Sequence, residues 1–263
     1  MGTKTSVIAF ANNKGGSGKT TTCANVGFSL AAQGKKVLLI DGDMQMNLTL
    51  SFFGEEEVLA MATGEHNLYH AIRQERDIRE DIVSTPYEGL DLVPSTTLMS
   101  GIEYELFTRW QREMILKNCL KNVREEGIYD YILIDAPPTL GGWVMNILVA
   151  ADWVVLPVEA SPWGLFGVAN MFDFLDDVKK INPDLGLLGI VVTKVDMRKN
   201  YGKQTLETLR ETENVRVFDT YIRIDSEVEW AQDNSLPVYI HKKSARSAAE
   251  YFALAKEMDA LCQ

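Results

Sequence analysis

The sequence predicts an α/β fold built on a mostly parallel, twisted sheet with helices on both faces. Three observations lead to it. Short apolar segments rich in β-branched residues alternate with segments of helical periodicity, as in strand–helix–strand units. Several of these apolar segments run into an aspartate, and a glycine-rich segment follows the first of them. Ligands bind at the carboxyl ends of the strands in sheets of this kind.

The first predicted strand, Ser6–Ala11, leads into the segment Asn12-Asn13-Lys14-Gly15-Gly16-Ser17-Gly18-Lys19-Thr20-Thr21. A helical pattern follows over residues 22–33 and ends at a glycine. A glycine-rich turn before a helix N-terminus directs backbone N–H groups and the helix dipole at an anion. In such a loop Lys19 reaches the β- and γ-phosphates of a nucleotide, and the Thr20 hydroxyl ligates Mg²⁺.

The second predicted strand, residues 35–41, ends on Asp41 and is followed at once by Gly42 and Asp43. Acids at the carboxyl ends of parallel strands face the ligand crevice. Two aspartates separated by one residue suit Mg²⁺ coordination and the orientation of a water molecule. We therefore expect both acids beside the glycine-rich loop.

A third strand, residues 129–135, ends on Asp135 and is followed by Pro137 and Pro138. The prolines end the strand because they cannot continue the hydrogen-bonded ladder. An apolar strand that ends in an acid is the Walker B arrangement. We expect Asp135 to hold Mg²⁺ through a bound water.

The rest of the chain predicts further strand–helix units in a single domain, residues 1–263. Residues 54–88 suggest solvated helix faces, and residues 98–124 one or two helices. Strands are expected at residues 90–94, 153–159 and 187–193, and a final helix at residues 244–261. In that last helix Lys256 is flanked by the acids Glu250, Glu257 and Asp259, so we expect no stable membrane anchor.

Composition restricts the classes of function. The 263 residues carry a net charge of −11, which opposes general affinity for nucleic acid and leaves only local basic patches. The three cysteines, Cys23, Cys119 and Cys262, show no Cys-x-x-Cys spacing. Buried thiols are expected at the first two positions, and the cysteine usage predicts a cytoplasmic protein.

Three segments together resemble the ParA family of the ParA/MinD superfamily, whose phosphate loop is a deviant Walker A box. The first is Lys-Gly-Gly-x-Gly-Lys-Thr-Thr from Lys14, with Asn13 where the general pattern has glycine. The second is Asp-x-Asp from Asp41, with Met44 and Met46 at the family's proline and glycine positions. The third is the apolar strand with Asp135-x-Pro-Pro.

The resemblance implies an ATPase that uses Mg²⁺. It implies that Lys14 reaches across a face-to-face dimer to the partner's nucleotide, and that Asp43 orients the attacking water and lies at the metal. Asp196, in Thr193-x-x-Asp196, either contacts the base or caps a helix. The implied cofactor-binding residues are Lys14, Gly15, Gly16, Ser17, Gly18, Lys19, Thr20, Thr21, Thr193, Asp196 and Pro237; the implied metal site is Thr20, Asp43 and Asp135.

The family also implies partners: a homodimer when ATP is bound, a ParB-like stimulating protein, and non-specific DNA. The cycle segregates or positions plasmid or chromosomal DNA, and DNA binding implies association with the nucleoid. Glu227 occupies the place of one expected arginine. The candidate DNA contacts are Arg198, Lys199, Lys203, Arg223, Lys242 and Lys243.

Three other functions share parts of this pattern. A MinD-like or other cargo-positioning ATPase uses the same nucleotide site. A nucleotide-dependent interaction module with little hydrolysis is suggested by Met44 and Met46. A reductase of the nitrogenase iron-protein type needs paired cysteines at a shared 4Fe–4S cluster, and Cys23 and Cys119 are poorly placed for that role.

Overall fold

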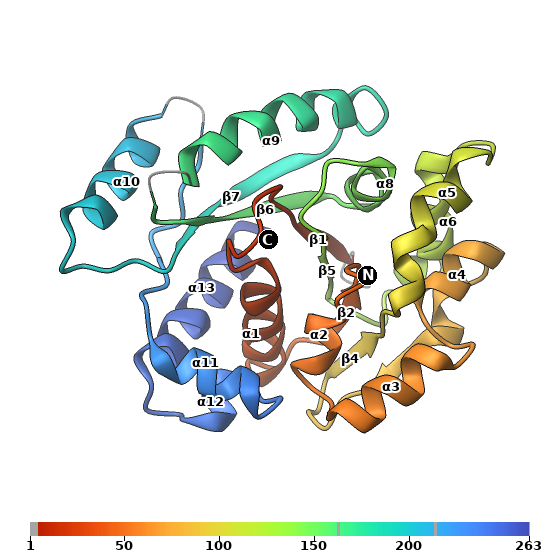
Figure 1. The fold of residues 1–263 in the computed structure, drawn as a ribbon, viewed down its shortest axis with the longest axis horizontal. Helices are drawn as coiled ribbons and strands as arrows, with labels where there is room; N and C mark the ends of the chain where they lie inside the picture. Colours follow the sequence, from red (N-terminus) through yellow and green to blue (C-terminus); the bar gives the residue numbers. More distant parts are fainter. Residues whose placement is uncertain (1–4, 162–163, 213–214, 263) are drawn as a thin grey trace.

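The computed structural model describes residues 5–161, 164–212 and 215–262. One seven-stranded sheet forms its centre, in the order β3-β4-β2-β5-β1-β6-β7 (Figure 1). Neighbouring strands are parallel except for β3, which pairs antiparallel with β4 at the edge. The strands are β1 (Ser6–Phe10), β2 (Val37–Asp41), β3 (Val83–Ser84), β4 (Leu90–Val93), β5 (Tyr131–Asp135), β6 (Trp153–Glu159) and β7 (Gly186–Thr193).

Helices cover both faces, so the expected fold class is confirmed (Figure 1). One face carries α1 (Lys19–Ala32), α2 (Asn47–Leu50), α3 (Glu55–Thr63), α11 (Ser226–Asp233), α12 (Val238–His241) and α13 (Arg246–Cys262). The other carries α4 (Leu68–Gln74), α5 (Ile102–Phe107), α6 (Ile115–Cys119), α7 (Lys121–Glu125), α8 (Gly142–Ala150), α9 (Gly164–Lys179) and α10 (Asn200–Glu211).

Two hydrophobic cores result from the two-residue period of the strands. In β5, Ile132 and Ile134 belong to one core, whereas Tyr131 and Leu133 belong to the other. Strands buried on both faces must be apolar at nearly every position. This requirement is why the sequence marks the central strands so clearly.

Two expectations from the sequence differ in detail from the observed helices. Helix α1 begins at Lys19, inside the glycine-rich segment, rather than at residue 22. Residues 98–124 form several short helical segments instead of one or two helices: the 3₁₀ turns Thr97–Gly101 and Arg112–Met114 with α5, α6 and α7. A third 3₁₀ turn covers Ile78–Asp81.

The expected burial of Cys23 and Cys119 is confirmed, and Cys262 is half-buried. None of the described helices combines the length and the apolarity needed to cross a bilayer.

Candidate nucleotide-binding site

The glycine-rich loop connects the carboxyl end of β1 to the N-terminus of α1. Asn12 fixes its start: the amide nitrogen donates to the Pro157 carbonyl at 2.7 Å, and the amide oxygen accepts from the Lys14 N–H at 2.9 Å. At the other end the Thr193 hydroxyl donates to the Ser17 carbonyl at 2.7 Å. Gly18 has a φ of 87°, a left-handed conformation that favours glycine at this point directly before the helix.

Lys19 lies buried beneath this loop, and its ammonium donates to the Lys14 carbonyl at 3.1 Å. Burial lowers the pKa of Lys19, while the nearby carboxylates of Asp135 and Asp43 oppose that shift. A buried ammonium held at the mouth of a loop of N–H groups is suited to bind an anionic phosphate. Phosphate binding by Lys19 stays a prediction, and the position of its ammonium is consistent with it.

The Thr20 hydroxyl donates to Asp135 Oδ2 at 2.6 Å. The other carboxylate oxygen, Asp135 Oδ1, is buried and has no hydrogen-bond partner. Burial, and then the charge of Asp41, raise the pKa of Asp135 well above its ordinary value. A buried carboxyl with a free oxygen beside a hydroxyl is a donor set that fits Mg²⁺, which takes few protein ligands alongside phosphate and water oxygens.

Asp41 and Asp43 have different environments. Asp41 is fully buried and accepts from the Thr49 backbone N–H at 2.8 Å and hydroxyl at 2.7 Å, and burial raises its pKa to about 6. It ties the end of β2 to α2. Asp43 is half-buried in the following turn, where its Oδ1 accepts from the Gln45 N–H at 3.1 Å. Met46 closes this turn in a left-handed conformation, with a φ of 57°.

A cavity of about 1260 Å³ opens above these groups. It is lined by the loop from Gly15 to Thr21 and by Asp43, so the structure brings the candidate phosphate and water-orienting residues together. Side chains that the sequence did not single out complete the wall, among them Gln45, Lys194, Asp225 and Gln232. The candidate DNA contact Arg223 lies in the same wall. Gln232 donates to the Thr21 hydroxyl at 2.9 Å. It lies in short helix α11, far along the chain, and no motif in the sequence marks it.

Three of the implied cofactor residues, Lys14, Asp196 and Pro237, lie outside this lining. Asp196 binds the backbone N–H and guanidinium of Arg198, at 3.1 and 2.9 Å. It does not cap α10, because Lys199 occupies that helix's N-cap position. Pro237 is buried at the start of α12, where the N–H of the following residue donates to Asn25. Thr193, by contrast, lines the cavity.

Three of the six candidate DNA contacts are paired with acids. Arg198 pairs with Asp196. Arg223 pairs with Glu250 at 2.5 Å, and Lys242 with Glu227 at 2.5 Å. Lys243 lies over the ring of Tyr239, Lys199 is exposed, and Lys203 lies in α10 with its side chain outside the described structure. The basic residues thus form a partly neutralised surface.

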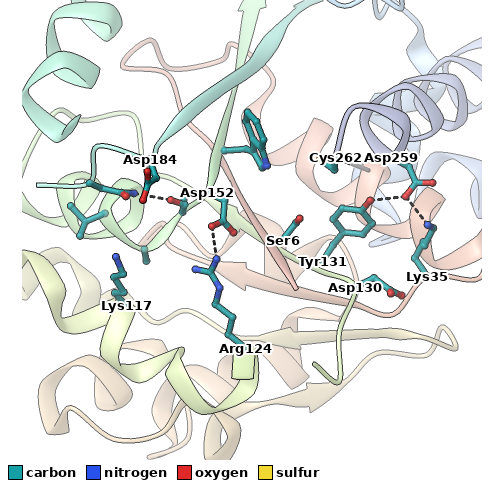
Figure 2. Close-up of a pocket in the computed structure, with 15 residues that line it drawn as sticks. Ser6, Lys35, Lys117, Arg124, Asp130, Tyr131, Asp152, Asp184, Asp259 and Cys262 are labelled. Carbon is teal, nitrogen blue, oxygen red and sulfur yellow. Dashed lines mark hydrogen bonds and ion pairs between the residues drawn. The ribbon is translucent and has the colours of Figure 1, made fainter. Parts of the chain in front are cut away.

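A second cavity, of about 840 Å³, lies at the opposite ends of the strands, near Ser6 and Tyr131 (Figure 2). Four of its charged side chains form two ion pairs: Arg124 with Asp152, and Lys35 with Asp259 at 2.6 Å. The Tyr131 hydroxyl donates to Asp259 at 2.6 Å. No unpartnered buried side-chain atom among the described residues lines it. We therefore interpret the side chains around this cavity as a structural polar cluster and not as a binding site.

A parallel sheet with a glycine-rich loop, a buried lysine and a threonine–aspartate pair at its carboxyl edge defines a P-loop nucleotide-binding protein. A family model described as an AAA domain (AAA_31) matches residues 5–187. The sporulation initiation inhibitor protein Soj of Bacillus subtilis is 37% identical over 97% of this chain and 98% of its own. The chromosome partitioning protein ParA of Caulobacter vibrioides is 33% identical, covering 96% of this chain and 93% of its own. The chain therefore belongs to the AAA-domain family of Soj and ParA.

The solved structures agree with this fold and ligand class. Cobyrinic acid a,c-diamide synthase from Mycobacterium smegmatis, with bound ATP analog and magnesium, superposes with a TM-score of 0.82. It is 30% identical, over 96% of this chain and 93% of its own.

Proposed function

We propose that this chain is a ParA-like partition ATPase, a dimeric switch that hydrolyses ATP to ADP and phosphate. The observation that carries the proposal is the Thr20–Asp135 pair with its free carboxylate oxygen, beneath the phosphate loop and beside Asp43. Similarity to partitioning proteins along nearly the whole chain supports the biological role.

The chain's own groups supply most of the chemistry. The loop amides and Lys19 bind the phosphates, and Thr20 with Asp135 would hold Mg²⁺, which neutralises the charge that develops on the phosphates. Of the two aspartates that follow β2, Asp43 lines the cavity, whereas Asp41 is buried against Thr49. Asp43 therefore orients the water for in-line attack on the γ-phosphate.

Lys14 completes the site in a second subunit. An ammonium supplied in trans at the γ-phosphate both requires dimerisation and stabilises the transition state, as an arginine finger does. ATP thereby favours the dimer, and hydrolysis releases it. A ParB-like partner that stimulates slow hydrolysis, and DNA held by the ATP-bound dimer, complete the proposed cycle and place the protein at the nucleoid.

Two alternatives to a partition ATPase remain: an ATPase that positions another cargo, and a nucleotide-dependent interaction module with little hydrolysis. The left-handed Met46 keeps the turn after Asp43 closed, with the Met46 N–H donating to the Asp43 carbonyl at 3.0 Å. The turn therefore retains a shape that holds Asp43 toward the cavity, which favours hydrolysis over a purely binding role.

The test is Mg²⁺-dependent phosphate release by the wild type and by Asp43→Ala, with nucleotide affinity measured in parallel. Loss of a group that activates water lowers turnover by about 10²-fold or more. Asp233→Ala is the matched control, because Asp233 is an exposed acid at the same cavity. Unchanged turnover in Asp43→Ala would contradict the assigned role, and turnover absent from the wild type would support the interaction module.

A further inference from the structure

A buried tryptophan of helix α8 is hydrogen-bonded to the turn that carries Asp43. The indole Nε1–H of Trp143 donates to the Gly42 carbonyl at 2.8 Å. The side chain of Trp143 is only 2% exposed, so water cannot readily replace this donor.

The Gly42 carbonyl and the Asp43 N–H belong to the same peptide unit, and both are held. The Asp43 N–H donates to Asp41 Oδ1 at 3.2 Å, on the opposite side of the peptide from the indole. The Gly42 N–H donates in turn to the Asp135 carbonyl at 3.0 Å. A peptide plane fixed at both of its polar groups restricts the backbone of Asp43, and hence the direction of its carboxylate.

The wall around Gly42 is closely packed. A Cβ atom added there would lie 2.6 Å from the Asp135 carbonyl oxygen and 3.1 Å from Ile147 Cδ1. Gly42 therefore packs closely against β5 and α8, with no room for a side chain.

Glu103 of α5 fixes the position of Trp143 itself. Its carboxylate oxygens accept from the backbone N–H groups of Gly142 and Trp143, each at 3.0 Å. These are first-turn donors of α8, where a carboxylate also interacts favourably with the helix dipole. The chain of contacts runs from α5 through α8 to the peptide before Asp43.

We propose that Trp143 is a positioning residue for Asp43: its indole N–H holds the Gly42–Asp43 peptide in the orientation that directs the carboxylate to the attacking water. The inference rests on the proposed role of Asp43. Trp143 does not line the nucleotide cavity, so it acts on the rate through Asp43 and leaves nucleotide binding to the loop.

The test replaces Trp143 by phenylalanine, which keeps a large aromatic ring and removes the N–H donor. We expect kcat for ATP hydrolysis to fall about five- to tenfold, the loss caused by leaving one buried carbonyl without its donor. KM for ATP and the affinity for a non-hydrolysable analogue should stay unchanged. Trp110→Phe is the matched control, because it is the same substitution at a position that is 89% exposed.

A second measurement is independent of turnover. The indole N–H resonance that disappears in Trp143→Phe should exchange with solvent far more slowly than that of Trp110. Glu103→Gln, which retains one of the two acceptor oxygens, should speed this exchange and lower kcat by about two- to threefold. The Glu103→Gln variant also tests the inference if Trp143→Phe does not fold.

An unchanged kcat in Trp143→Phe, together with loss of turnover in Asp43→Ala, would overturn this inference and leave the proposed function intact. A parallel fall in kcat and nucleotide affinity would indicate general distortion and overturn it too. Exchange of the Trp143 indole as fast as that of Trp110 would show that the hydrogen bond is absent. Full turnover in Asp43→Ala would contradict the proposed role of Asp43 and, with it, the positioning role of Trp143.

Discussion

The Lys14 ammonium lies 2.8 Å from Glu159 Oε2, within its own chain. It also donates to the Ser161 hydroxyl at 2.9 Å. Glu159 ends β6, and the hydrogen bond from Lys14 lowers the pKa of its carboxyl. Lys14, which we propose reaches a partner's nucleotide, is thus folded back on its own subunit. In the proposed dimer, Lys14 leaves this pair.

Removing the charge of Glu159 should make that release easier. We expect Glu159→Gln to tighten the ATP-dependent dimer about five- to thirtyfold, because two half-buried ion pairs, one in each subunit, contribute about 0.5–1 kcal/mol each. Sedimentation velocity across a protein titration with ATP measures the effect. Glu207→Gln, an exposed change of the same charge on α10, is the control. A weaker dimer in Glu159→Gln would show that this carboxylate supports the assembled state instead.

Met46 should reveal the strain in the turn after Asp43. A residue with a Cβ costs about 1–2 kcal/mol in the left-handed region, which glycine avoids. Met46→Gly should therefore be more stable than Met46→Ala by about 1 kcal/mol, or about 2–4 °C in Tm. At the exposed position 253 inside α13 the order should be reversed, so that Ala253→Gly is less stable than the wild type. Equal stability of the two Met46 variants would argue against a left-handed conformation there.

DNA binding should depend on how far the basic side chains are released from their acids. Glu227 pairs with Lys242 and contacts His241, so Glu227→Gln should strengthen retention of non-specific duplex and steepen its salt dependence. Charge reversal at Arg198 and Lys199 should weaken retention and flatten the salt dependence. Fluorescence anisotropy with ATP at several salt concentrations tests both. No retention of DNA by the wild type at low salt would remove DNA from the proposed cycle.

The sequence predicted the central strands and the phosphate loop because both depend on local patterns. Strands buried on both faces need continuous apolar residues, and an anion-binding loop needs glycines before a helix. The Thr20–Asp135 pair followed from this topology, since β1 and β5 are neighbours in the sheet.

What the sequence did not reveal depends on contacts between distant segments. Glu159 and Trp143 have no motif, and their partners are known only once the fold brings them together. The same holds for Gln232 in the cavity wall. The broken helices of residues 98–124 lack a long amphipathic period, so packing against α8 decides where they begin and end.

The most direct test of the proposed switch is the oligomeric state of Lys14→Ala with and without ATP, measured by sedimentation velocity. The account predicts that this variant binds ATP with ordinary affinity yet remains a monomer at concentrations where the wild type dimerises. Lys36→Ala, an exposed lysine before β2, should dimerise normally. An ATP-dependent dimer of Lys14→Ala as stable as that of the wild type would contradict the role of Lys14 in the partner's site.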